Sequence, residues 1–147
     1  LICIYACADY KPIFGSANLQ FEIADYSVEG DRKLGNKIYS KLYNLSKSNK
    51  NQKETTSVVI KIKVLKEKNS TSKDATGKIL EYKINLNTKV IVKNYLTNDT
   101  LLDKNFISSS SYKVQDQHSE TIKLENKVTE NLLNKTYQEI LIKLFKL

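Results

Sequence analysis

Cys7 has the sequence context of a thiol that becomes lipidated. In Ile4-Tyr5-Ala6-Cys7, an aliphatic residue lies three positions before the cysteine and a small residue lies directly before it, as in a bacterial lipobox. Small residues before a cleavage point suit a signal peptidase. We therefore expect residues 1–15 to contain the end of a lipoprotein signal peptide, the lipidation site Cys7 and a tether. The alternative is an N-terminal edge strand that buries Cys3 and Cys7.

Lysine is the second residue type whose chemistry is informative, because it makes the chain basic. Lysine and arginine together number 24 against 16 acidic residues, a formal charge of +8, and Arg32 is the only arginine. A cationic surface attracts anionic partners such as nucleic acid, acidic lipid head groups or phosphorylated sugars. Lysine, asparagine and isoleucine are abundant together, so a base-composition bias of the genome is an alternative explanation for part of the charge.

Residue patterns for catalysis or metal binding are missing from the sequence. His118 is the only histidine and lies in a polar run, where we expect it to face solvent. The chain has no CxxC, no His-x-x-x-His pair, no phosphate-binding glycine loop and no nucleophile elbow. The Ser108–Ser111 run has no histidine partner nearby and is interpreted as a solvated strand. We expect a protein that is not an enzyme, with no metal site and no cofactor.

The elements that would position these residues follow from the apolar periodicity. Alternation predicts strands over 19–27 and 58–65, and helical spacing predicts a helix over 32–47 whose turn and N-cap come from Gly30-Asp31. Turn-forming residues fill 67–78. A strand over 80–96 would be near 60 Å long at about 3.3 Å per residue, so we expect a bulge or bend around Asn85 to Thr88.

The C-terminal part of the sequence predicts one more strand and one long helix. Residues 97–100 suit a hairpin turn, 101–115 a strand, and 119–147 a helix capped by Ser119. The fold class is therefore α+β: a two-layer sandwich in the order β-α-β-β-β-α, with a four-stranded, mostly antiparallel sheet and two helices packed on one face. Residues 16–147 form a single domain. The open face would carry a cationic stripe of Lys61, Lys63, Lys83, Lys89 and Lys93.

Several short motifs, taken with this order of elements, resemble the LPS-assembly lipoprotein family, LptE. The matching residues are Cys7, the run Tyr10-Lys11-Pro12-Ile13-Phe14-Gly15, the helix opening Gly30-Asp31-Arg32, and the pair Ser111-Tyr112 before the long helix. The resemblance extends from Cys7 to about Leu144. It departs from the family at Ala8-Asp9, where a single glycine is usual.

The resemblance implies a non-enzymatic, lipid-anchored protein on the periplasmic side of the outer membrane. In that family the lipoprotein plugs the LptD β-barrel, assists its assembly and helps deliver lipopolysaccharide to the cell surface. The implied partners are thus an LptD-type barrel, lipopolysaccharide, and membrane lipid through acylated Cys7. Under this hypothesis the five stripe lysines contact lipopolysaccharide phosphates or the barrel lumen.

Two other functions are compatible with the same residues. A lysine-lined sheet can track nucleic-acid phosphates, although the outward positions of the predicted strands offer almost no aromatic residue except Tyr95 for base stacking. We therefore expect no nucleic-acid partner. The other alternative is a periplasmic scaffold lipoprotein with a different partner.

Overall fold

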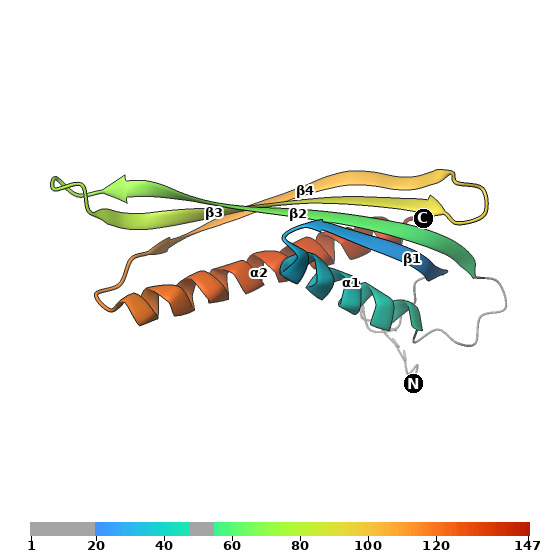
Figure 1. Ribbon diagram of the computed structural model, residues 1–147, viewed down its shortest axis with the longest axis horizontal. Helices are drawn as coiled ribbons and strands as arrows, with labels where there is room; N and C mark the ends of the chain where they lie inside the picture. The colour runs from blue at the N-terminus through green and yellow to red at the C-terminus, as the bar shows by residue number, and fades with distance from the viewer. Residues whose placement is uncertain (1–19, 48–54) are drawn as a thin grey trace, which may run out of the picture.

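The computed structural model describes residues 20–47 and 55–147. It has the order β1 (Phe21–Gly30), α1 (Arg32–Lys47), β2 (Thr56–Lys73), β3 (Ile79–Asn94), β4 (Thr100–Lys113) and α2 (His118–Leu144). The strands form one mixed sheet in the order β1-β2-β3-β4, with both helices on one face (Figure 1). The expected α+β sandwich is confirmed. Cys7 and the rest of the predicted anchor segment lie outside the described residues.

A sharp change of direction after β1 places α1 on the sheet. Gly30 has a positive φ of 74°, which suits glycine because it lacks a Cβ. The backbone N–H of Asp31 then donates to the carbonyl of Val64 at 2.7 Å, and the Asp31 carboxylate accepts a hydrogen bond from the N–H of Leu34 at 3.1 Å. The predicted N-cap is confirmed. After α1 the chain returns as β2, parallel to β1.

β2 is longer than its apolar alternation predicts. It pairs antiparallel with β3 as far as Lys73, so the predicted turn region of 67–78 is wrong over its first seven residues. The reason is tertiary: the polar residues of Glu67–Lys73 gain ladder hydrogen bonds from β3, and the reversal itself needs only residues 74–78, where Gly77 has a φ of 84°.

No bulge interrupts β3 around Asn85 to Thr88, where a bulge or bend is expected. In that segment β3 keeps a continuous register with both β2 and β4. The irregularities lie instead near Ser70–Lys73 and between Val92 and Lys93. Because β2 and β4 run beside β3 over its full length, the twist shared by the three strands replaces a local bend.

α2 begins one residue before the predicted start and has a different cap. Its N-cap is Gln117, which makes no side-chain capping hydrogen bond, so the prediction of a Ser119 cap is wrong. The Thr121 hydroxyl instead accepts from the N–H of Gln115 at 2.8 Å, which ties the first turn to the preceding loop. The helix ends at Leu144, three residues before the predicted end at Leu147.

The core lies between the helices and one face of the sheet. Its fully enclosed side chains come from α1, β2, β3 and α2, and they include Ile38, Leu42, Ile60, Ile62, Ile84, Leu86, Leu133 and Ile140. Ser108 is also buried and shares a hydrogen bond of 3.2 Å with the Thr136 hydroxyl. The interpretation of the whole serine run as solvated is therefore wrong at Ser108. Neither of the two described helices covers the opposite, outer face of the sheet, which holds the predicted lysines.

Candidate functional site

The five lysines predicted from the sequence all lie on the outer face of the sheet. They alternate along β2 and β3 with core residues that face the helices, such as Ile62 and Val90. Strand pairing divides them into two groups. Lys61 and Lys63 lie across from Ile91 and Lys89, and Lys93 lies across from Val59. Lys83 is six residues before Lys89 on β3 and pairs with Asn69 and Ser111, so it lies about 20 Å from Lys89 along the strand and farther still from Lys93.

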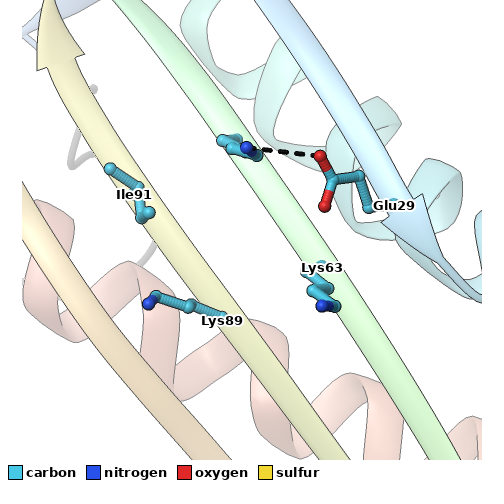
Figure 2. A pocket seen from close by; sticks show the side chains of 5 residues that line it. Glu29, Lys63, Lys89 and Ile91 are labelled. Atoms are coloured by element: carbon cyan, nitrogen blue, oxygen red, sulfur yellow. Dashed lines mark ion pairs between the residues drawn. The ribbon is translucent and has the colours of Figure 1, made fainter.

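Lys61, Lys63 and Lys89 surround an open hollow of about 200 Å³ on this face. Glu29 and Ile91 complete its lining (Figure 2). The hollow thus draws side chains from three adjacent strands, β1, β2 and β3. We define the outer-face site as these five residues.

Two carboxylates neutralise part of the positive charge of the outer face. The Glu29 carboxylate forms an ion pair with the Lys61 ammonium at 3.2 Å, the dashed line in Figure 2. The Asp103 carboxylate of β4 lies 3.9 Å from the Lys89 ammonium. Lys63 has no ion pair within the described part of the chain, and its Cα is directly opposite that of Lys89. Like charges on opposed residues repel, so an anion in the hollow would relieve that repulsion.

The sequence did not indicate Glu29, Asp103 or Ile91 as parts of the site. The predicted first strand stopped at residue 27, and nothing local to Glu29 shows that β1 pairs in parallel with β2. That register places Glu29 across from Lys63. Asp103 was missed for the same reason, because its proximity to Lys89 depends on the β3–β4 register. An inspection of acidic residues in all outward strand positions could have found both.

A second polar cluster lies on the inner face, at the far end of the sheet from the start of β1. Glu125 of α2 contacts Lys68 at 2.9 Å, Lys66 at 3.4 Å and the Tyr112 hydroxyl at 3.2 Å. The Lys68 ammonium also lies 4.3 Å from the centroid of the Tyr82 ring. The Glu125 carboxylate thus binds three groups of the sheet, so the cluster stabilises the packing of α2.

The ionisation of this cluster follows from its contacts. Burial alone would raise the pKa of Glu125, but the Lys68 hydrogen bond and the charges of Lys68 and Lys66 outweigh it and lower that pKa. The same hydrogen bond raises the pKa of Lys68. Burial raises the pKa of Tyr112. The cluster is therefore an ion pair between charged partners at neutral pH.

Other candidate residues have simple surroundings. His118 is exposed at the first position of α2, and Arg32 is exposed in the first turn of α1, as expected. Among residues 20–47 and 55–147, no cluster of three or more His, Cys, Asp or Glu side chains could hold a metal ion. Over the same residues no helix has the length and apolarity to cross a membrane.

No protein-family model and no curated protein sequence matches the chain. Its fold does match solved structures. Rare lipoprotein B from Shewanella oneidensis is 12% identical with a TM-score of 0.55, covering 80% of this chain and 93% of its own. Lipoprotein B from Nitrosomonas europaea is 15% identical with a TM-score of 0.60, and the match covers 85% of this chain and 84% of that protein. A minor lipoprotein from Acinetobacter baumannii is 12% identical with a TM-score of 0.57, and the match covers 83% of this chain and 90% of that protein. All three share the fold.

Proposed function

We propose that this protein is a non-enzymatic lipoprotein of the Gram-negative outer membrane, held on the periplasmic side by an acylated Cys7. The observation that carries this proposal is the fold, because three solved bacterial lipoproteins have it over 80% or more of this chain. The Ile4-Tyr5-Ala6-Cys7 pattern supports it independently, since it comes from residues that the fold comparison does not need. One acyl chain binds a membrane only marginally, whereas two or more give stable anchoring.

We further propose that the domain plugs an LptD-type β-barrel, assists its assembly and helps deliver lipopolysaccharide. The support is the resemblance of the motifs to the LptE family and the chemistry of the outer-face site. Lysine ammonium groups are mobile point charges that bind phosphate without a rigid pocket. Lys63 has no carboxylate partner among the described residues, so it is the most available cation of the site, and Lys61 and Lys89 can exchange carboxylates for phosphate oxygens.

The anchor is tested by mass spectrometry of the mature protein isolated from membranes. We expect cleavage before Cys7 and a mass increase that corresponds to two or three acyl chains. The Cys7→Ser variant should remain unacylated and should leave the membrane fraction. An unmodified Cys7 in the mature wild-type protein would contradict the proposal.

The phosphate contact is tested by neutralising the site and comparing it with an equal loss of charge elsewhere. The triple variant Lys61→Gln, Lys63→Gln, Lys89→Gln lowers the formal charge from +8 to +5 (8 − 3). The matched control changes the exposed Lys33, Lys127 and Lys135 to Gln and has the same charge. We expect the site variant to bind lipopolysaccharide roughly tenfold more weakly at low salt. Equal affinities of the two variants would refute a specific contact.

The barrel partner is tested by affinity purification of the tagged lipoprotein from detergent-solubilised envelopes. We expect one outer-membrane β-barrel to co-purify in stoichiometric amount, and the barrel should be identified by mass spectrometry as LptD-type. Stoichiometric recovery of a different barrel or scaffold would overturn the LptD assignment and leave the lipid anchor in place.

A further inference from the structure

The turn between β3 and β4 presents its most apolar residues to solvent. Leu96 is 86% exposed, more than any other large hydrophobic residue in the described part of the chain, and the neighbouring Tyr95 is 56% exposed. Leu101, at the start of β4, adds a third exposed apolar side chain, at 39%. A single exposed leucine is ordinary, but three exposed apolar side chains within seven residues of one hairpin end are the kind of grouping that marks a contact with an external apolar environment.

The same turn satisfies its own backbone polar groups. The Asn94 side chain accepts hydrogen bonds from the N–H groups of Leu96 at 2.9 Å and Thr97 at 3.1 Å. The Asn98 N–H donates to the Asn94 carbonyl at 2.9 Å, and the Asn94 N–H donates to the carbonyl of Asp99 at 2.8 Å. Backbone groups without partners are costly to place in lipid. This turn therefore has few unpaired donors to desolvate if it enters a membrane interface.

The tip lies at the end of the molecule where the described chain begins. β1 starts with Phe21 beside Thr56, and the N–H of Tyr95 donates to the carbonyl of Ser57 at 2.9 Å. Figure 1 shows the start of β1, the start of β2 and the β3–β4 turn at one end of the sheet. Twelve residues lie between Cys7 and Gln20, a length that spans at most about 45 Å. An acylated Cys7 would hold this end of the domain near the bilayer.

The opposite end of the sheet has different chemistry. The β2–β3 turn consists of residues 74–78 and contains no large apolar residue; the exposed apolar side chain next to it is Leu80 on β3, at 43%, the counterpart of Leu101 at the other end. Its Asp74 carboxylate accepts hydrogen bonds from Thr76 and from the N–H of Lys78. The polar turn suits an aqueous environment, so the two ends of the long sheet differ in the solvent that they fit.

We propose that the β3–β4 turn inserts Leu96 and Tyr95 into the interface of the bilayer to which Cys7 is anchored. This inference rests on the lipid anchor of the proposed function. Leucine supplies the apolar contact, and tyrosine, with an apolar ring and a polar hydroxyl, suits the level of the head groups. The flanking charges, Lys93 and Asp99, have opposite signs, so the contact requires no anionic lipid and is insensitive to salt.

The chain contains no tryptophan, which allows a single reporter to test the contact. The acylated full chain carrying Leu96→Trp is placed in vesicles of zwitterionic phosphatidylcholine and phosphatidylethanolamine, with and without brominated acyl chains. The matched control is Ile107→Trp, because Ile107 is 70% exposed but lies on the outer face of β4, away from the tip. We expect the Leu96→Trp emission to shift to shorter wavelength and to lose most of its intensity to bromine, equally at about 0.1 M and 1 M salt. Ile107→Trp should do neither.

Mass spectrometry of the same samples separates the failure of this inference from that of the anchor. A bare Cys7 would remove the anchor and with it the tip contact. An acylated Cys7 with an unquenched Leu96→Trp would overturn the tip contact alone, as would equal quenching of both reporters, which would place the sheet face on the membrane.

Discussion

On the inner face of the sheet, the two halves of β2 present different chemistry to the helices. In the four-stranded half, where β1 pairs with β2 up to Val64, the face is aliphatic, and Ile60 and Ile62 are fully buried beneath the helices. In the three-stranded half beyond Val64, β2 presents Lys66 and Lys68, which meet Glu125 of α2, while their partners on β3, Leu86 and Ile84, stay fully buried. One continuous strand therefore serves two kinds of packing.

The difference arises from where the β1–α1 connection leaves the sheet. The chain turns at Gly30, opposite Val64, so α1 covers only the four-stranded half. α2 alone covers the rest (Figure 1). Lysine stems and tyrosine rings are half apolar, and they can shield a sheet face while their polar ends satisfy one another. A strand can thus extend beyond its aliphatic cover when it changes residue type at the boundary.

Ile62→Ala should give the largest effect, because it removes a fully buried side chain from the aliphatic half. We expect the free energy of unfolding to fall by about 3 kcal/mol, the usual cost of a core cavity of this size. Urea denaturation followed by circular dichroism measures it. The control is Leu65→Ala on the outer face, which is 46% exposed and should cost less than about 1 kcal/mol. Equal losses would contradict the assignment of the two faces.

Gly30→Ala, at the end of β1, should lower the free energy of unfolding more than Gly77→Ala in the β2–β3 turn. Both glycines have positive φ, which costs an alanine about 1–2 kcal/mol. A Cβ at Gly30 would also collide with the Val64 carbonyl oxygen, whereas one at Gly77 would meet nothing within 4 Å. We expect a loss of about 3 kcal/mol for Gly30→Ala and about 1 kcal/mol for Gly77→Ala. A smaller loss at Gly30, measured by thermal unfolding, would show that the crossover is not tightly fixed.

The aliphatic half could be predicted from the sequence, and the polar half could not. Alternation over Val58–Leu65 predicts a one-faced strand because every second residue is strongly apolar. The following Glu67–Lys73 segment has no such signal, because it contains no apolar residue and its strand state depends on pairing with β3. Local propensity predicts turns in this segment, but pairing with β3 makes it a strand.

The candidate site shows the same limit. Strand alternation was sufficient to place Lys61, Lys63 and Lys89 on the outer face, because parity along a strand is a local property. The ion pairs with Glu29 and Asp103 depend on the registers of β1 and β4, which no local pattern encodes. The separation of Lys83 from the other lysines is local, and counting residues along the strand would have predicted it.

Glu125→Gln should weaken the three-stranded half in a pH-dependent manner. The glutamate makes charge-assisted hydrogen bonds to Lys68 and Lys66, so we expect a loss of roughly 1.5 kcal/mol at neutral pH. The pKa of Glu125 is lower in the folded protein than its ordinary value of 4.5. Its stabilisation is therefore full above pH 4.5 and is lost as the pH falls through the folded pKa. Denaturation curves of both proteins should converge in acid; a constant difference would contradict the ion pair.

Thr88→Val should have the smallest effect, and it should be stabilising. Thr88 lies on the inner face at the boundary of the two halves, paired with Val64, and is fully buried. Its hydroxyl is the one buried side-chain oxygen without a hydrogen-bond partner in the described part of the chain. Because valine removes a desolvated polar group at nearly constant shape, we expect a gain on the order of 0.5–1 kcal/mol. The matched variant Thr136→Val breaks the hydrogen bond to Ser108 and should lose a similar amount, since it leaves that buried hydroxyl unsatisfied. An equal loss of stability in both variants would contradict this prediction, because it would mean that the Thr88 hydroxyl, like that of Thr136, makes a stabilising hydrogen bond in the folded protein.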